Sequence, residues 1–199
     1  MFAAHGAAIE TLADAGVAED GAEALIESFA TFEENAVAKA RWFAGLLSDR
    51  VVIAEDSGLE VDALFGAPGV RSKRWSEDDG WWVPSGAADD ETARDEANTQ
   101  RLLFELEAAS RAGRSTRSAR YVCAAACVWP EGVVVVRGET AGTIERVRRG
   151  TGGFGYDPVF RSLELGATFA EVSREEKARV SHRGRAFDEL IGRLGSIER

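Results

Sequence analysis

Residues 51–58 read VVIAEDSG, a short apolar run that passes directly into two carboxylates, a serine and a glycine. A compact β-branched run of this kind is typical of a buried strand. Carboxylates at the C-terminal end of a strand, followed by glycine, occur where α/β proteins place their sites. We therefore expect a strand over Val51–Ala54, with Glu55 and Asp56 at its end. The alternative is a strand-end turn closed by an Asx hydrogen bond.

Helical patterns lie on both sides of this strand. The clearest runs from Thr31 to Leu47, where apolar residues recur at steps of three and four. Thr31 followed by Glu34 matches a capping box, which favours a helix start at that point. Further helices are predicted over residues 1–16, 92–109, 174–179 and 183–194. The core candidates are Leu102, Leu103 and Leu106 in the helix over 92–109 and Phe187, Leu190, Ile191 and Leu194 in the helix over 183–194.

Strand patterns complete the set of elements. Residues 120–129 and 132–137 are predicted strands joined by Pro130-Glu131, which indicates a hairpin. Residues 66–69, GAPG, are a predicted turn. Because strands and helices mix throughout the chain, the fold class is α/β. The two cysteines, Cys123 and Cys127, lie in an apolar run and are expected to be buried free thiols.

Composition narrows the classes of function. The 199 residues are 45% hydrophobic and 29% charged, with a net charge of −10. Such an acidic balance argues against a protein that coats nucleic acid. No apolar run approaches the roughly 20 residues of a membrane helix, and no signal peptide is evident, so we expect no membrane partner and a cytoplasmic protein. A local basic cluster, which a phosphate substrate would need, lies near the C-terminus: Arg174, Lys177, Arg179, Arg183 and Arg185.

Two carboxylates are candidates for metal chemistry. Mg²⁺ prefers carboxylate oxygens and usually binds through one or two of them together with substrate phosphates. Glu34 near a helix start and Asp56 at a strand end could converge on one ion, and a carboxylate could deprotonate an attacking water. The alternatives are that Glu34 only caps its helix and that Asp56 only closes a turn.

A glycine-rich segment, GTGGFGYDP at residues 150–158, is the next candidate. It spells G-x-G-x-x-G, but Pro158 follows where a dinucleotide fold requires a helix to begin, so we reject that interpretation. The loop could instead offer backbone N–H groups to phosphates and the ring of Phe154 to a base. The alternative is a glycine-rich hairpin with Phe154 in the core.

Two further features carry open alternatives. Lys177, His182 and Arg183 bring cations and donors to the start of the last helix, where they could neutralise phosphate or contact a base. The alternative is that Lys177 lies on a solvated helix face, that Ser181 caps the last helix and that the histidine has no functional role. The paired tryptophans Trp81 and Trp82 lie in a predicted loop over residues 76–90, as a lid or as an anchor of that loop.

Taken together and in order, four segments resemble the inosine triphosphate pyrophosphatase family of house-cleaning NTPases. They are TFEENAVAKAR from Thr31, AEDSGLEVDALFGAPGVRSKRWS from Ala54, GTGGFGYDPVF from Gly150 and SREEKARVSHRGRAF from Ser173. The resemblance implies an elongated mixed β-sheet flanked by helices, with two lobes around a central cleft, in a homodimer. It also implies Mg²⁺-dependent cleavage of purine nucleoside triphosphates such as ITP, dITP and XTP to the monophosphate and pyrophosphate.

The same resemblance implies roles for individual residues. Glu34 and Asp56 match metal-binding positions, and Asp56 also matches the base that activates water. Glu55 stands where many members carry Asp. The positions that match substrate contacts are Ser57, Arg74, Phe154, Gly155, Tyr156, Asp157, Lys177, His182 and Arg183.

One departure from the family pattern concerns the beginning of the sequence. The family opens with a strand leading into a T-x-N-x-x-K phosphate loop, and neither is found here. We therefore expect residues 1–199 to be a single NTP pyrophosphatase domain that is truncated at its N-terminus, or to start too late. The alternative functions are a nucleotide-binding but inactive truncated homologue and a related pyrophosphatase with another nucleotide specificity.

Overall fold

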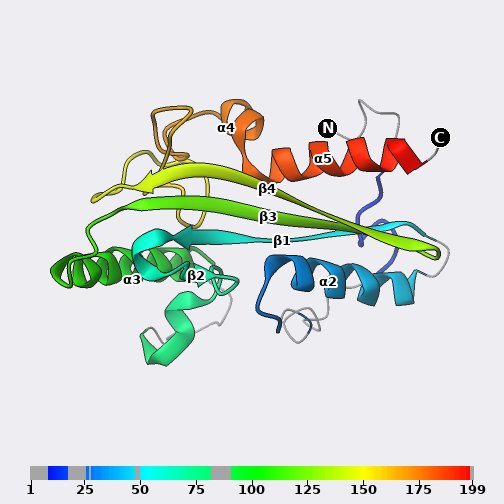
Figure 1. The fold of residues 1–199 in the computed structure, drawn as a ribbon, viewed down its shortest axis with the longest axis horizontal. Coiled ribbons are helices and arrows are strands. Elements are labelled where there is room, and N and C mark those ends of the chain that lie inside the picture. The colour runs from blue at the N-terminus through cyan, green and yellow to red at the C-terminus, as the bar shows by residue number, and fades with distance from the viewer. Residues whose placement is uncertain (1–8, 18–25, 27, 48–49, 82–90, 198–199) are drawn as a thin grey trace. The chain divides into compact units, whose positions relative to one another are not determined.

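The computed structural model describes residues 9–17, 26, 28–47, 50–81 and 91–197 (Figure 1). Its helices are α2 (Phe32–Leu46), α3 (Glu91–Arg111), α4 (Arg174–Val180) and α5 (His182–Ile197), with short 3-10 helices η2 (Asp62–Leu64) and η3 (Trp75–Gly80). Its strands are β1 (Val52–Val61), β2 (Pro68–Gly69), β3 (Ser118–Trp129), β4 (Gly132–Ile144) and β5 (Phe160–Ser162).

The strands form one five-stranded sheet in the order β2-β1-β3-β4-β5. Both edge strands pair antiparallel with their neighbours, β2 with β1 and β5 with β4. β3 and β4 are neighbours joined only by Pro130 and Glu131, so the predicted hairpin is confirmed. The α/β class is confirmed as well. Both edge pairs are antiparallel, so neither of them is the parallel pair that a mixed sheet would contain.

The chain divides into two compact units. The first comprises Met1–Asp56, Cys123–Gly138 and His182–Arg199, and the second comprises Ser57–Val122 and Glu139–Ser181. The division falls inside three strands, so that β1, β3 and β4 each supply residues to both units. Two units agree with the two lobes that the resemblance implied.

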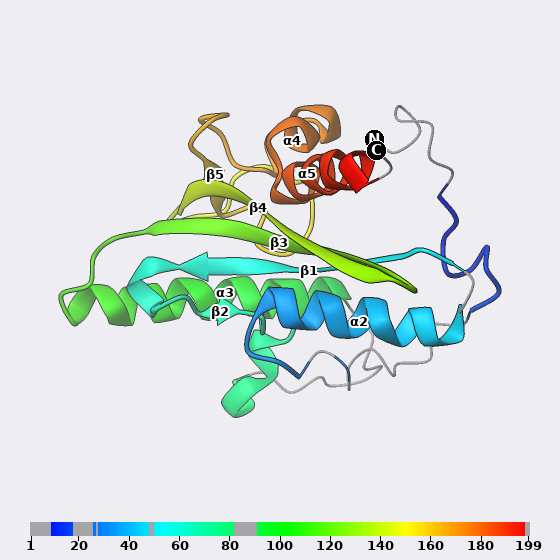
Figure 2. The same cartoon turned by 45° about the vertical axis from the view of Figure 1, so that its right-hand side comes forward.

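In the first unit, α2 and α5 lie on opposite faces of its strand segments (Figures 1 and 2). α5 buries Ala186 and Leu190 against Cys123 and Cys127 of β3, which confirms the predicted burial of both thiols. A glycine permits this close approach, because a Cβ at Gly138 would lie 2.3 Å from the backbone oxygen of His182. Gly138 therefore fixes how closely the start of α5 lies against β4.

In the second unit, α3 covers one face of the strand segments and packs Leu102 and Leu106 into the core, as predicted. An aromatic cluster shares this core: the ring of Tyr121 lies 4.5 Å from that of Phe160 and 5.8 Å from that of Phe169, centroid to centroid. These contacts provide a dense support for the glycine-rich loop, which precedes β5.

Three predicted elements need correction. The strand expected over Val51–Ala54 continues to Val61, so Glu55 and Asp56 lie within it rather than at its end. The helix expected over residues 1–16 is a turn in its described part, closed by hydrogen bonds such as Ala15 N–H to the Thr11 oxygen. The second strand of the hairpin extends to Ile144 rather than residue 137.

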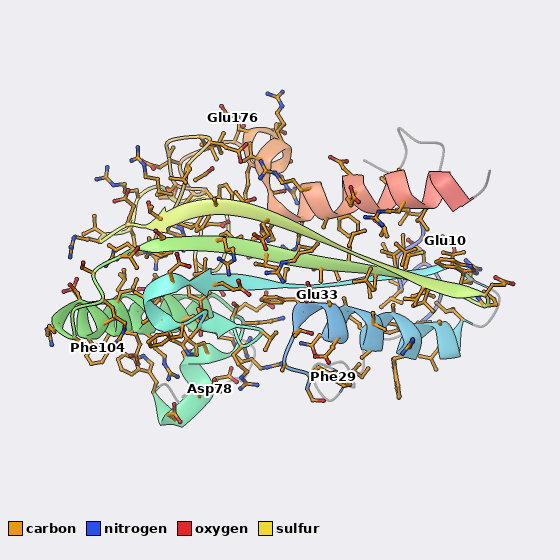
Figure 3. All side chains as sticks on the ribbon, viewed as in Figure 1. Glu10, Phe29, Glu33, Asp78, Phe104 and Glu176 are labelled. Atoms are coloured by element: carbon orange, nitrogen blue, oxygen red, sulfur yellow. The ribbon has the colours of Figure 1, made fainter. Side chains whose placement is uncertain are left out.

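Other predicted elements hold. α2 begins at the predicted cap, where Thr31 accepts the N–H of Glu34. Trp81 packs against Phe104 of α3, which Figure 3 labels, with ring centroids 4.8 Å apart, and this favours an anchoring role for the tryptophan. Trp82 lies outside the described residues. Among the residues that are described, no helix combines the length and apolar character needed to cross a bilayer.

Candidate functional site

The first group of candidate residues lies where α2 meets β1, within the first unit. Asn35 is 1% exposed, and its Nδ2 donates to Asp56 Oδ2 at 2.9 Å. Its Oδ1 accepts the backbone N–H of Phe29 at 3.0 Å, just ahead of the helix (Figure 3). Since an amide oxygen accepts and an amide nitrogen donates, the N–H of Phe29 fixes which end of Asn35 faces Asp56.

A second contact reinforces this position one turn further along α2. Lys39 donates from Nζ to the backbone oxygen of Glu55 at 3.1 Å. Residues four apart on a helix share one face, so Asn35 and Lys39 together hold two consecutive residues of β1. α2 thereby sets the position of the strand segment that carries Glu55 and Asp56.

Glu55 is the centre of a polar network on β1. Arg183, the second residue of α5, donates to Glu55 Oε1 from Nε at 3.2 Å and from a terminal nitrogen at 3.1 Å. Cys123 donates from Sγ to the other carboxylate oxygen at 3.4 Å. Burial, and next the charge of Glu55, raise the pKa of the Cys123 thiol far above its ordinary value. This cysteine is therefore a neutral hydrogen-bond donor and not a nucleophile.

Glu34 lies beside this group at the N-terminal end of α2. Its carboxylate accepts from the Thr31 hydroxyl at 2.8 Å, while the neighbouring Glu33 pairs with Arg137 at 3.0 Å. Because Asn35 follows Glu34 and contacts Asp56, the structure brings Asp56 beside the first turn of α2. Within the described ranges, no set of three or more His, Cys, Asp or Glu side chains is arranged to hold a metal. A site here would depend on two carboxylates, which is within the range for Mg²⁺.

His182 and Arg183 open α5 in the same unit. His182 is 6% exposed and so belongs largely to the packed interior, whereas Arg183 is partly exposed at its ion pair with Glu55. The structure therefore groups Arg183 with Glu55 on the face of β1 that α5 covers, whereas Asp56 contacts Asn35 of α2 on the opposite face. It places His182 mainly as a packing residue at the helix start.

The second group of candidate residues lies on the glycine-rich loop, within the second unit. The side chain of Phe154 is 61% exposed, so the alternative that placed it in the core is wrong. The ammonium of Lys177 lies 4.6 Å from the centroid of this ring, a cation–π arrangement. Phe154 is thus an exposed ring suited to a base, and beside it lies the largely covered ammonium of Lys177, which also pairs with Asp157.

The backbone amides of this loop are largely engaged within the protein. The N–H of Phe154 donates to Asp157 Oδ2 at 3.0 Å, and that of Gly155 donates to Asp95 Oδ2 at 2.6 Å. The N–H of Gly152 donates to the oxygen of Ala170 at 3.0 Å. These three N–H groups already donate to carboxylates or to a carbonyl of the protein. The expectation that they bind phosphates is therefore wrong at these positions.

Asp157 acts as the internal support of the loop. Its side chain is almost fully buried, and it accepts from the Tyr121 hydroxyl at 3.3 Å and from the ammonium of Lys177. Glycine is required nearby, because a Cβ at Gly153 would lie 2.1 Å from Asp157 Oδ2. The carboxylate of Asp157 thus binds both the loop and Lys177. Its expected contact with substrate would therefore be indirect, through Lys177.

Tyr156 and Arg74 complete the comparison with the predicted residues. Tyr156 is 4% exposed and donates its hydroxyl to the backbone oxygen of Ser72 at 3.0 Å. Burial raises the pKa of this phenol well above its usual value, so it stays protonated. Arg74 is partly exposed on a segment that Asn98 secures, since its amide bonds the backbone of Lys73 and Ser76. Ser57, next to Asp56 in β1, is also partly exposed.

Sequence reasoning missed three of the residues that organise these groups. Asn35 contacts Asp56 and Asp95 contacts Gly155, both predicted site residues, and Cys123 contacts Glu55, the neighbour of Asp56. Asn35 adjoins Glu34 in the quoted motif, which was a usable signal. Asp95 is 60 positions from its partner, and no local pattern marks it.

Comparison with known sequences gives a consistent set of relatives. The model of the Ham1 family matches residues 1–193. The dITP/XTP pyrophosphatase of Streptomyces avermitilis is 42% identical over 189 residues, 90% of this chain and 86% of the relative. That of Mycobacterium tuberculosis is 47% identical over 174 residues, 86% of this chain and 76% of the relative. That of Syntrophobacter fumaroxidans is 43% identical over 171 residues, 83% of this chain and 64% of the relative, so the match spans less than two thirds of that protein.

Solved structures lead to the same group. The Staphylococcus aureus Ham1 protein superposes with a TM-score of 0.70 at 38% identity, covering 85% of this chain and 79% of that one. A HAM1 protein from Coxiella burnetii gives a TM-score of 0.72 at 36% identity with the same coverage. Both likenesses extend over most of the chain, so they concern the fold as a whole and not a single motif.

Proposed function

This chain belongs to the Ham1 family, and from that premise we propose that it hydrolyses non-standard purine nucleoside triphosphates, such as dITP and XTP, to the monophosphate and pyrophosphate. The observation that carries this proposal is the set of relatives named dITP/XTP pyrophosphatase, at 42–47% identity over most of the chain. The grouping of Asp56, Asn35 and Glu34 is consistent with this proposal, since carboxylates can hold a metal ion that assists the hydrolysis of a triphosphate.

We assign metal binding to Glu34 and Asp56. Carboxylate oxygens suit Mg²⁺, which binds through one or two of them when substrate phosphates supply further oxygens. When bound, Mg²⁺ would offset negative charge on the phosphates and on the departing pyrophosphate. Asn35 suits this assignment, because its amide fixes the direction in which Asp56 presents its carboxylate.

Asp56 is also our candidate for the base that takes a proton from the attacking water. Proton transfer requires a group held within hydrogen-bond reach of the water, and Asn35 and Lys39 hold this part of β1. Water then attacks phosphorus, the anhydride bond breaks, and pyrophosphate leaves.

Binding of the nucleotide is assigned to residues of the remaining motifs, all of them at least partly exposed except His182. The ammonium of Lys177 lies over the ring of Phe154, so the other face of that ring is our candidate for stacking on the purine. Arg183, Arg74 and Ser57 are candidates for phosphate contacts, and His182 for a contact to the base. Donors directed at the purine 6-position would favour a keto oxygen and disfavour the amino group of adenine, because a buried donor left unpaired costs binding energy.

The two groups of residues adjoin one another along the chain. Asp56 precedes Ser57, and Ser181 precedes His182, at two of the four places where the sequence passes between the units. The family resemblance leads us to assign both groups to one substrate. The family resemblance further leads us to propose Mg²⁺ as the metal, a homodimer as the assembly and the cytoplasm as the compartment.

The experiment that tests the function measures pyrophosphate release by the purified chain from dITP, XTP, dATP and dGTP, with and without Mg²⁺. We expect release from dITP and XTP only, in the presence of Mg²⁺, and its loss in Asp56→Asn. A conservative change of a distant exposed carboxylate, Glu164→Gln, should leave the rate unchanged. Binding of dITP without turnover would contradict the proposal and favour an inactive nucleotide binder, while turnover of all four nucleotides would contradict the base selectivity.

A further inference from the structure

The exposed ring of Phe154 is held in place through its neighbour Gly155. The N–H of Gly155 donates to Asp95 Oδ2 at 2.6 Å, and its backbone oxygen accepts from the Thr99 hydroxyl at 3.4 Å. Asp95 and Thr99 are four residues apart, so they lie on one face of α3. A single helix face therefore binds both polar backbone groups of the residue that follows Phe154.

The helix that supplies these contacts is well supported. α3 extends over 21 residues and buries Leu102 and Leu106, and Thr99 itself is only 1% exposed. The loop, in contrast, lacks helix and strand over residues 151–159. Gly155 has a φ of +58°, which glycine adopts readily and other residues rarely. The position of Phe154 thus depends on contacts within the loop to Asp157 and on the contacts that α3 makes to Gly155.

Of the two contacts from α3, the one to Asp95 is the stronger. A hydrogen bond to an ionised carboxylate is roughly twice as strong as a neutral one, and 2.6 Å is short whereas the Thr99 contact is long. From this we propose that Asp95 is a positioning residue for nucleotide binding, which holds Gly155 so that the ring of Phe154 stays available to stack on the base. The inference rests on the proposed function in one respect only, the role of Phe154 in stacking on the base.

The contact itself can be observed at the amide of Gly155 by nuclear magnetic resonance. Labelling phenylalanine carbonyls with ¹³C and glycine nitrogens with ¹⁵N selects the two Phe–Gly pairs of the sequence, at residues 65–66 and 154–155. A Phe65→Leu sample identifies the second pair. We expect a downfield Gly155 proton that moves upfield in Asp95→Ala and much less in Asp95→Asn, because asparagine keeps an acceptor oxygen.

The functional consequence is measured with inosine monophosphate as the probe, without metal. Loss of a charge-assisted hydrogen bond weakens an interaction by about tenfold or more. We expect the Kd for this probe to rise about tenfold in Asp95→Ala and to remain within about threefold of wild type in Asp95→Asn. For dITP, KM should rise in parallel while kcat changes little, because Asp95 does not touch the reacting phosphate.

Glu107→Ala is the matched control. Glu107 lies on the same helix and pairs with Arg146 at 3.0 Å, so its removal takes an equal charge from α3 without touching the loop. An unchanged Gly155 amide in Asp95→Ala, or a shifted amide with an unchanged Kd, would overturn the inference, as would a wild-type protein that binds no inosine monophosphate. A wild-type protein that binds the probe but leaves dITP intact would refute the proposed hydrolysis, and the binding series would still decide the role of Asp95.

Discussion

The side-chain amide of Asn35 donates to Asp56 across 2.9 Å, and the same side chain accepts the N–H of Phe29 at 3.0 Å. Asn35 is 1% exposed, so water cannot readily replace it in either contact. The amide therefore couples the entry to α2 with the orientation of the carboxylate to which we assign catalysis. Asn35 takes no chemical part in the proposed reaction, but it sets the geometry of Asp56, which does.

Asn35→Ala should reduce both activity and stability. Two buried groups lose their partner, which lowers the free energy of unfolding by about 1–3 kcal/mol. A carboxylate misplaced by about 1 Å can lose on the order of 100-fold in rate, so we expect kcat for dITP to fall roughly 10- to 100-fold with a smaller change in KM. Steady-state kinetics and urea unfolding measure the two effects.

Phe43→Leu provides the control for stability alone. Phe43 is 5% exposed on α2, and its shortening costs about 1–2 kcal/mol through the cavity it leaves. We expect near wild-type kcat in this variant. Equal losses of kcat in both variants would mean that the helix as a whole, and not the amide of Asn35, supports Asp56.

Glu55→Gln should weaken nucleotide binding through Arg183. The guanidinium donates twice to Glu55 Oε1, and glutamine retains an acceptor but no charge. A hydrogen bond between two charged groups that becomes singly charged loses about half its strength, so Arg183 becomes less ordered and KM for dITP rises by a factor of about 3–10. Glu55→Asp keeps the charge and should stay closer to wild type; the reverse order would contradict the ion-pair account.

Local patterns in the sequence predicted α2, α3 and α5 well, although the helix expected over residues 1–16 was wrong in its described part. α2 begins where Thr31 and Glu34 indicated, and α3 buries Leu102 and Leu106 as their spacing required. Helix periodicity and caps are determined by residues within a few positions of one another, so a single sequence carries them. The core contacts of α5, through Leu190, follow from the same rule.

Long-range contacts account for what the sequence did not reveal. β1 was expected to end at Ala54 because polar residues follow, yet strand pairing extends it to Val61. Strand formation depends strongly on neighbouring strands, which local propensity does not encode. The amide of Gly155 was expected to face phosphate, but Asp95, 60 residues earlier in the chain, accepts its hydrogen. The site residues were found through motifs, and their supports only through the fold.

Gly153→Ala should destabilise the second unit more than Gly155→Ala. At Gly153 φ is +74° and an added Cβ would lie 2.1 Å from Asp157 Oδ2, so backbone strain and a clash with a buried carboxylate combine. We expect a loss of about 2–4 kcal/mol in the free energy of unfolding. At Gly155 the space is open and strain alone applies, about 1–2 kcal/mol. Equal losses measured by chemical unfolding would contradict the clash with Asp157.

Both cysteines should resist alkylation in the folded protein. Burial raises the pKa of Cys127 to about 11, and burial with the nearby Glu55 raises that of Cys123 still further. At pH 8 only about one Cys127 side chain in a thousand would be a thiolate even if reagent reached it. Iodoacetamide followed by mass spectrometry should modify neither site natively and both in denaturant. Rapid native labelling of Cys123 would contradict its place beside Glu55.

Asp95 should make stability depend on pH in the acid range. Burial is the main cause that raises the pKa of this carboxyl, against lowering by the Gly155 N–H and by Arg94; Glu91 and Asp157 add to the increase. The folded protein therefore binds the proton more tightly, and this group's contribution to stability falls as pH rises from the unfolded value of 3.8 through the folded value. Asp95→Asn should remove this part of the dependence in thermal unfolding from pH 3.5 to 7, with Glu107→Gln as the control.

The passage of β1, β3 and β4 from one unit to the other has a consequence for how this chain can be altered. Each unit is assembled from stretches that are widely separated in sequence, so no single cut releases either one as an intact fragment. Neither unit can be exchanged between genes as one continuous segment. During synthesis, the first unit cannot be completed before α5 has emerged. An insertion or deletion inside any of the three shared strands would therefore disturb both units at once.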